Sequence, residues 1–262
     1  MINPPFTATY RGNPSSFVAI EVLVARLKHI RSIRSIILVG SFSRGDSDEF
    51  SDIDLLIVLD GKTTRTSLRE VLPKEIKSSQ VSLICYSTRS FWRQYRKRTL
   101  FMFHVLQEGS ILYDDGLVSS TSRNYEVSTE DLLLQWRIAK SRAESLGNLS
   151  VYGNIFVDPL SRLYPLAKKI CILALAFRGE FLFNRHSVYY AMIREFPDLA
   201  DNLRELYGLR PFAIAWKRPI RTSLPFAPVN CRRETERLRD LLKQVIDRVE
   251  QNEPKIHRSI TV

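Results

Sequence analysis

The chain has few of the features that place a protein in a membrane or outside the cell. No run of about 18 apolar residues occurs, so we expect no membrane span. The N-terminus lacks the charged and apolar regions of a secretory signal. Cysteine is scarce, and the three that occur match neither a metal-ligand spacing nor a disulfide framework; they are Cys85, Cys171 and Cys231. Cys85 and Cys171 lie in apolar runs and are predicted to be buried free thiols. The sequence therefore favours a cytoplasmic protein.

Acidic residues are too few to balance the basic ones. The 262 residues include 28 Asp and Glu but 39 Lys and Arg, which gives a formal net charge of +11 spread over both halves. Such a charge favours polyanionic partners, and RNA could contact the basic surface. A role in solubility alone explains the excess of positive charge equally well. A cationic antibiotic is the poorer electrostatic match for a basic protein.

One short stretch combines glycine, serine and paired carboxylates. An apolar run ends at Gly40-Ser41, and a second opens with Asp52-Ile53-Asp54. Alternate side chains of a strand share one face, so Asp52 and Asp54 point the same way. Two carboxylates on one face can bind a hard cation such as Mg²⁺. Solvent-facing aspartates are the simpler alternative, but unpaired charge is costly within an apolar strand, so we predict a metal site.

The residues around this bend suit phosphate. Gly40 allows the backbone to turn and approach a ligand closely, and Ser41 with the following amides could begin a helix whose N-terminus attracts anions. Arg44 adds positive charge and Gly45 a second permissive backbone position. Mg²⁺ in proteins commonly takes one or two carboxylates together with substrate phosphates. We predict phosphate contacts from Gly40, Ser41, Arg44 and Gly45, and metal-binding, catalytic roles for Asp52 and Asp54.

These residues resemble a known family. The pattern Gly-Ser-x-x-Arg-Gly followed by Ser-Asp-Ile-Asp-Leu-Leu is similar to the nucleotidyltransferase superfamily that includes DNA polymerase beta. It is closest to the minimal and the aminoglycoside nucleotidyltransferases. Residues 101–114 resemble the Phe-x-x-His-x-x-x-Glu-Gly-x-x-Leu-Tyr-Asp stretch common in that group. The resemblance covers about residues 16–116.

The resemblance implies Mg²⁺-dependent transfer of a nucleoside monophosphate, AMP in the first instance, from ATP or another nucleoside triphosphate. Pyrophosphate is the leaving group. The acceptor is a hydroxyl of a protein, an RNA end or a small molecule, and the motif does not specify which.

The chain departs from the family at one position. Members usually carry a third carboxylate on a later strand, near Ser82 here, yet no Asp or Glu occurs between Ile76 and Gln107. A base from elsewhere could replace it, and Glu108, Glu144 and Asp158 are candidates. Alternatively, two carboxylates suffice, or transfer is lost. In the last case the chain is a catalytically weakened nucleotide- or RNA-binding regulatory module of a defence or toxin-antitoxin system.

Periodicity and breakers predict an α+β protein. The resemblance implies that residues 1–118 form a nucleotidyltransferase-fold mixed sheet domain, and the helical pattern beyond it predicts an all-helical bundle domain, residues 119–262. Residues 207–229 contain four prolines and are predicted to be an irregular loop. Strands are expected at 35–39, 52–59, 80–86 and 111–113. Helices are expected at 16–30, 66–77, 87–98, 99–108, 129–146, 159–178, 186–195, 198–206 and 232–251.

Two pairs of residues at helical spacing have simple structural explanations. His104 and Glu108 are four residues apart and predict a structural hydrogen bond rather than a metal pair. Phe91 and Tyr95 are predicted to pack inward while the neighbouring cations stay solvated, although stacking on nucleic acid is the alternative.

Arg178 and His186 invite comparison with the Arg-x(4–6)-His signature of helical ribonucleases. Seven residues separate them here. The spacing therefore does not favour ribonuclease activity.

Overall fold

The chain folds into an α+β protein, as the sequence predicts. The computed structural model describes residues 14–60, 68, 81–122, 124–146, 157–217 and 231–253. It divides into two compact units, Met1–Ser128 and Thr129–Val262. The sequence placed the boundary between residues 118 and 119. Val118 and Tyr125, however, are buried in the core of the first unit, which extends that unit beyond the predicted position.

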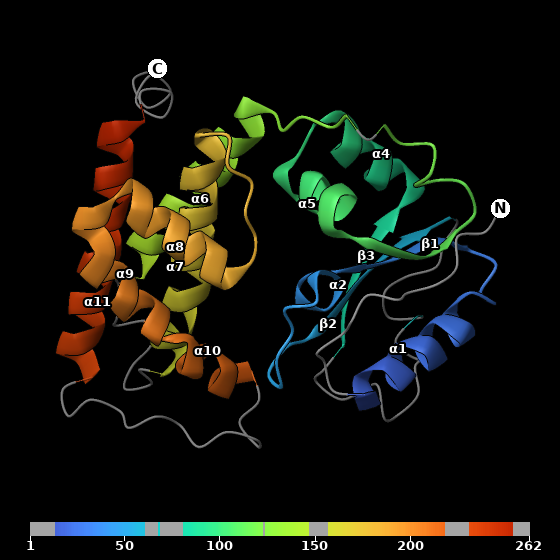
Figure 1. The fold of residues 1–262 in the computed structure, drawn as a ribbon, viewed down its shortest axis with the longest axis horizontal. Coiled ribbons are helices and arrows are strands. Elements are labelled where there is room, and N and C mark those ends of the chain that lie inside the picture. The colour runs from blue at the N-terminus through green and yellow to red at the C-terminus, as the bar shows by residue number, and fades with distance from the viewer. Residues whose placement is uncertain are drawn as a thin grey trace. The chain divides into compact units, whose positions relative to one another are not determined.

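The first unit is built on a four-stranded mixed sheet with the order β3-β2-β1-β4 (Figure 1). β1 pairs antiparallel with both β2 and β4, whereas β2 pairs parallel with β3. The central pair β1 and β2 is almost entirely apolar and buried, as expected of strands covered on both faces. The strands are β1 Ile33–Val39, β2 Ile53–Leu59, β3 Val81–Ser87 and β4 Ser110–Asp114.

Helices cover both faces of this sheet (Figure 1). One cluster buries the α1 side chains Leu23 and Leu27 against residues of β1 and β2 such as Leu55. On the opposite face of the sheet, a second cluster packs Phe91 of α4 and Met102 of α5 against the alternate residues of β1 and β2, such as Leu56. The helices are α1 Pro14–Leu27, α4 Thr88–Arg96 and α5 Leu100–Glu108.

Local capping explains where α4 and α5 begin. The Ser87 hydroxyl accepts from the Ser90 amide at 3.1 Å, and the Thr99 hydroxyl accepts from the Met102 amide at 3.3 Å. Phe91 is fully buried, while the cations of α4 lie in exposed positions. The predicted inward packing of this helix is confirmed, and its basic residues form a solvated face.

Gly109 follows α5 without the capping conformation that is common for glycine at a helix end. A glycine after a helix commonly adopts a left-handed conformation, but Gly109 has φ −74° and ψ 140°. A Cβ there would lie 2.2 Å from the Val105 carbonyl oxygen and 2.9 Å from Ile37 Cγ2. Glycine is required because the end of α5 packs too closely on β1 for any side chain.

The described part of the second unit is helical, in agreement with the sequence prediction. Its longest helices are α7 and α11, and α7 continues through Pro165. Trp136 of α6 is buried, and its indole N–H donates to Glu250 at 2.9 Å. The helices are α6 Thr129–Ser145, α7 Val157–Phe177, α8 Arg185–Glu195, the 3₁₀ turn η2 Pro197–Leu199, α9 Ala200–Gly208, α10 Arg210–Lys217 and α11 Cys231–Asn252.

One secondary-structure prediction is wrong. The segment from residue 207 was expected to be irregular, yet α10 occupies Arg210–Lys217. Pro211 is the second residue of that helix, where its missing N–H has no intrahelical partner to lose. The rest of that predicted loop, residues 218–229, lies outside the described residues, as does the helix predicted at 66–77 except for Leu68.

Among the described residues, none of the helices combines the length and the apolar character needed to cross a bilayer.

Candidate active site

The β1–β2 hairpin brings Gly40 against the carboxylate of Asp54. Val39 and Asp54 are cross-strand partners, so the bend after β1 lies beside the first residues of β2. Gly40 has φ 77° and ψ −152°, a conformation open essentially to glycine alone. A Cβ at this position would lie 2.8 Å from Asp54 Oδ2. The glycine thus supplies both the turn and the space beside the carboxylate.

Asp54 lies on the sheet face that α4 and α5 cover further along β2, and Asp52 directly precedes that strand. Asp54 continues the alternate row of Leu56 and Val58, which pack on those helices. Both aspartates are half-buried, at the end of the row. They are therefore placed where a ligand can reach them, at the edge of an apolar core.

Ser82 occupies the position next to this pair on the neighbouring strand. In the parallel register of β2 and β3, Asp54 is paired with Ser82. The strand β3 contains no acidic residue. The structure thus places a hydroxyl, and no carboxylate, beside Asp54 on the strand where the family usually carries its third acid.

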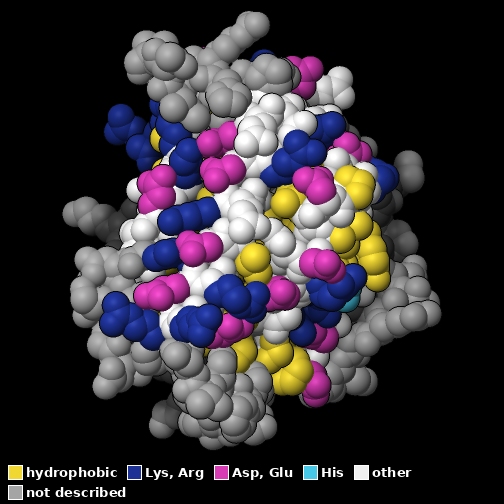
Figure 2. Space-filling view, turned by 90° about the vertical axis from the view of Figure 1, so that its left-hand side faces the viewer, with side chains coloured by type: hydrophobic (Ala, Val, Ile, Leu, Met, Phe, Trp, Pro, Cys, Tyr) yellow, Lys and Arg dark blue, Asp and Glu magenta, His cyan; other side chains and the backbone are white. Residues whose placement is uncertain are grey.

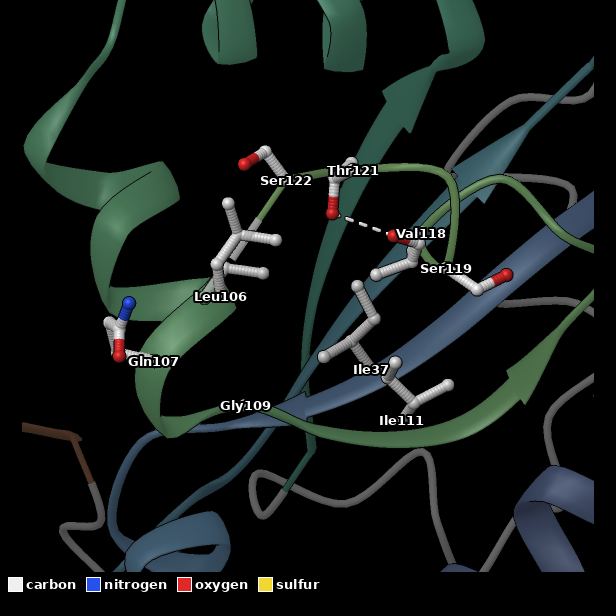
Figure 3. A pocket seen from close by; sticks show the side chains of 10 residues that line it. Ile37, Leu106, Gln107, Gly109, Ile111, Val118, Ser119, Thr121 and Ser122 are labelled. Atoms are coloured by element: carbon white, nitrogen blue, oxygen red, sulfur yellow. Dashed lines mark hydrogen bonds between the residues drawn. The ribbon is translucent and has the colours of Figure 1, made fainter. Parts of the chain in front are cut away.

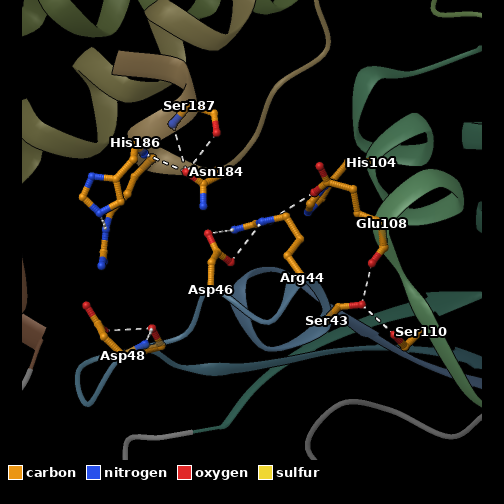
Figure 4. A network of polar contacts seen from close by, with 12 residues as sticks. Ser43, Arg44, Asp46, Asp48, His104, Glu108, Ser110, Asn184, His186 and Ser187 are labelled. Carbon is orange, nitrogen blue, oxygen red and sulfur yellow. Dashed lines mark hydrogen bonds and ion pairs between the residues drawn. The ribbon is translucent and has the colours of Figure 1, made fainter. Parts of the chain in front are cut away.

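The segment between the strands begins with a single helical turn, α2 Ser41–Arg44. Gly45 follows it with φ 75° and ψ 15°, the left-handed conformation that glycine adopts without strain. A second turn precedes Asp52, because the Asp48 carboxylate accepts from the Phe50 amide at 3.1 Å and from the Ser51 hydroxyl at 2.9 Å. These contacts fix the backbone that leads into Asp52 (Figure 4). Sequence reasoning missed this turn, although Asp with Ser three residues later is typical of one.

The side chain of Arg44 contacts acidic residues of its own unit (Figure 4). Its guanidinium donates to Glu108 at 3.1 Å and lies 3.2 Å from Asp46. His104 Nδ1 is 3.0 Å from the same Glu108 carboxylate, which is consistent with the predicted structural pairing of His104 and Glu108. Ser43 adds a hydrogen bond to the Glu108 carbonyl. The two segments on which the family resemblance rests therefore meet in one polar network.

Electrostatics keep Glu108 charged within this network. Burial by itself raises the pKa of a carboxyl group, but hydrogen bonding and charge from His104 and Arg44 outweigh that effect and lower the pKa of Glu108 below its usual value. A lowered pKa makes Glu108 a weak proton acceptor. Its geometry suits a fixed anchor for Arg44 better than the general base considered from the sequence.

Comparison with known proteins relates this region to a family. Residues 20–106 match the family model described as a nucleotidyltransferase domain. This part of the chain is similar to nucleotidyltransferase domains. The match includes α2, both aspartates, Ser82 and His104, and it ends two residues before Glu108. No curated protein matches the chain.

Two solved structures are similar to the chain as a whole. Spectinomycin adenyltransferase from Enterococcus faecialis, crystallised with ATP and spectinomycin, has 12% sequence identity, covers 87% of this chain and 98% of its own, and gives a TM-score of 0.47. A nucleotidyltransferase-like protein from Exiguobacterium sibiricum has 14% identity, covers 93% of this chain and 77% of its own, and gives a TM-score of 0.38. Because both TM-scores are below 0.5, these proteins carry no information on the ligands of this chain.

The donor set around Gly40 fits a magnesium ion. Asp52 and Asp54 offer carboxylate oxygens, the ligands Mg²⁺ prefers, and Gly40 leaves room beside Asp54 Oδ2 that a side chain would fill. Within the described ranges, no three His, Cys, Asp or Glu residues group to hold a metal. The remaining ligands of such an ion would come from phosphate and water, as is usual for Mg²⁺.

The other candidate residues belong to the second unit. Glu144 is exposed on α6, and the side chain of Asp158 is outside the described residues. Arg178 is ion-paired with Glu195 at 3.1 Å and with a second acid at 2.6 Å. His186 lies in the first turn of α8, whose amides are capped by Asn184. Arg178 is thus occupied by structural ion pairs.

A separate pocket of about 480 Å³ lies in the first unit between α5, β4 and the segment that follows β4 (Figure 3). Ile37, Leu106 and Ile111 give it apolar walls, and hydroxyl groups such as those of Ser119 and Ser122 line its rim. Its described lining includes no charged side chain and none of the predicted site residues. We assign it no part in phosphate or metal binding.

Proposed function

We propose that this protein is a Mg²⁺-dependent nucleotidyltransferase that moves a nucleoside monophosphate, AMP in the first instance, from ATP or another nucleoside triphosphate to a hydroxyl acceptor. The observation that carries the proposal is the contact of Gly40 with the Asp54 carboxylate inside a nucleotidyltransferase domain. Glycine at this bend lets the backbone that would face the phosphates lie directly beside a carboxylate oxygen that would bind the metal. A strand with merely solvated aspartates has no need of that close approach.

In this proposal, one set of residues would bind the metal and another would contact the phosphates. Asp52 and Asp54 would hold Mg²⁺, which when bound neutralises charge on the triphosphate. Gly40 and Ser41 would bring backbone amides to the phosphates, and Gly45 shapes the end of the same turn. The acceptor oxygen bonds to the α-phosphorus while the bond from that phosphorus to the bridging oxygen breaks. Pyrophosphate leaves, and the acceptor hydroxyl releases its proton.

In this proposal Arg44 holds other groups in position and does not itself contact the phosphates. A direct phosphate contact, as first predicted, would require its guanidinium to leave Glu108 and Asp46. Bound to Glu108 and Asp46, Arg44 connects α2 and the loop that follows it to the end of α5. The turn that carries Gly40 and Ser41 is thereby held fixed relative to Asp54. Preorganised groups of this kind lower the cost of ordering a substrate.

The decisive experiment compares nucleotide binding and turnover in matched variants. Calorimetry with ATP should show binding that requires Mg²⁺ and that the double substitution Asp52→Asn, Asp54→Asn abolishes. Asp60→Asn, at the opposite end of β2, removes the same charge and should leave binding intact. Labelled ATP added with cell extract should transfer label to one acceptor pool and release pyrophosphate. ATP binding that does not need Mg²⁺ and that is unchanged in the double variant would refute the proposal.

Ser82 favours a second candidate. A domain with a hydroxyl beside Asp54 on β3 could retain the nucleotide site and lose efficient transfer. The chain would then be a nucleotide- or RNA-binding regulatory module. This candidate predicts Mg²⁺-dependent ATP binding with the same sensitivity to Asp52 and Asp54, but no pyrophosphate release with any extract fraction.

A further inference from the structure

The helical unit contains a groove that the proposed activity does not use. The groove has a volume of about 630 Å³ and lies between α6 and α7, within the range of small-ligand sites. Arg142 and Ser145 line it from α6, and Arg162 and Lys169 from α7. Leu146, Pro165 and Leu166 complete its wall. Three cations and a hydroxyl thus converge on one hollow, and the described residues of its lining include no carboxylate.

This concentration of positive charge differs from the rest of the unit. Figure 2 shows one face of the molecule, on which basic and acidic side chains are interspersed. Neither Arg142 nor Lys169, in contrast, forms an ion pair with any residue in the described ranges. Elsewhere in the unit, arginines commonly contact acids, as Arg178 does with Glu253, Arg194 with Glu180, Arg204 with Asp201, Arg237 with Glu205 and Arg248 with Asp198.

The environment of Lys169 shows that its charge is only partly compensated. Its amine donates to the Gln135 side chain at 2.7 Å, a neutral partner. Burial and the positive charge of Arg142 lower the pKa of Lys169. The negative charge of Asp131 raises it, but to a smaller degree. Like charges held together beside a hollow are stabilised when an anion enters it.

We propose that the α6–α7 groove is a binding site for a phosphorylated small molecule, whose phosphate lies among Arg142, Arg162 and Lys169. Phosphate suits this set because arginine donates to it through two parallel N–H groups and lysine contributes a point charge. The Ser145 hydroxyl offers a further donor, and Pro165 and Leu166 an apolar surface for the remainder of the ligand. The site belongs to the helical unit alone, so it stands independently of the nucleotide site at Asp52 and Asp54.

Calorimetry with inorganic pyrophosphate tests the site in the full-length chain. EDTA is present throughout, so that Mg²⁺-dependent binding to the nucleotidyltransferase domain is suppressed. We expect pyrophosphate to bind, with affinity reduced about tenfold by Arg142→Gln and by Arg162→Gln, since each removes a charge-assisted hydrogen bond. Both side chains are exposed, so neither substitution should affect folding. Arg137→Gln, on α6 but outside the groove, is the matched control and should bind as the parent does.

A second set of variants separates this inference from the proposed function. The Asp52→Asn, Asp54→Asn protein should keep its pyrophosphate affinity in EDTA even though it no longer binds Mg²⁺-ATP. Equal weakening by all three arginine substitutions would mean a nonspecific charge effect and overturn the proposal, as would no binding. Binding of a single-stranded RNA tetranucleotide without binding of pyrophosphate would also overturn it, because the groove would then serve RNA.

Discussion

The Arg44 guanidinium donates to the Glu108 carboxylate at 3.1 Å, although 64 positions separate the two residues. The bond joins the turn after β1 to the end of α5. Both side chains are largely buried, with exposed fractions of 15% and 23%, so the pair is only weakly screened by water. Together with the hydrogen bond from Ser43 to the Glu108 carbonyl, it holds the turn that we propose to bind phosphate to the helical layer of its own unit.

Removing Glu108 should therefore destabilise the first unit. In Glu108→Ala, Arg44 and His104 lose their common acceptor in a half-buried setting, and we expect the free energy of unfolding to fall by about 2–3 kcal/mol. Urea denaturation of the full-length chain, followed by circular dichroism, measures the change. The released turn should also bind ATP more weakly.

The Arg98–Glu126 pair provides the control for this experiment. Its atoms are 3.8 Å apart and its side chains 62% and 86% exposed. Glu126→Ala should cost less than about 0.5 kcal/mol, as is typical of surface ion pairs. Equal losses in the two variants would contradict a special role for Glu108.

Asp114 should make stability depend on acid pH. Burial raises its pKa, but hydrogen bonds from the Ser35 hydroxyl and from Val118 and Ser119 outweigh this, so the pKa of Asp114 lies below its usual value. The folded state therefore binds fewer protons than the unfolded chain. The stabilising contribution is complete above the unfolded pKa of about 4 and is lost as the pH falls through the lower, folded value.

The substitution Asp114→Asn tests this dependence. The variant should be less stable than the parent at pH 7 and should lose less stability between pH 5 and the acid limit of folding, as measured by urea unfolding at a series of pH values. Glu126→Gln, which removes a carboxylate from an exposed side chain, should follow the parent curve. A curve for Asp114→Asn as steep as that of the parent would be inconsistent with the inferred hydrogen bonding.

Gly40→Ala should damage the nucleotide site beyond its effect on stability. The backbone conformation at residue 40 costs about 1–3 kcal/mol for a residue with a side chain, and the new methyl group would displace the Asp54 carboxylate. Gly45→Ala also places a side chain at positive φ, at a cost of about 1–2 kcal/mol. Its methyl group, however, meets no atom within 4 Å. We expect calorimetry to show loss of Mg²⁺-ATP binding in Gly40→Ala and retention in Gly45→Ala; retention in both would contradict the assigned role of Gly40.

The sequence predicted the features that follow from local pattern. The apolar runs of β1 and β2 and the alternation at Asp52 and Asp54 depend only on neighbouring residues, so periodicity sufficed to predict the strands. Helix α10 was missed because proline was read as a breaker, although its effect depends on its position within the helix. The left-handed glycine at residue 45 is likewise a local property.

Long-range contacts could not be predicted in the same way. The sequence identified Arg44 as a cation near phosphate, but the partners of a side chain depend on packing between distant elements. Glu108 was considered as a base because nothing in its neighbourhood indicates the approach of Arg44. A glycine after a helix suggests by itself only a cap, whereas the proximity of Gly109 to Ile37 arises only when α5 packs on β1.

Ser82→Asp should restore a third carboxylate beside Asp54, because the two positions are paired in the register of β2 and β3. A third oxygen ligand should strengthen divalent-cation binding about tenfold, as measured by Mn²⁺ titration in the absence of nucleotide. Ser87→Asp is the control, since it adds the same charge at the other end of β3 and preserves a capping side chain for α4. Pyrophosphate release should rise only in Ser82→Asp if the missing acid limits transfer. Equal Mn²⁺ affinity in both variants would show that residue 82 does not face the metal site.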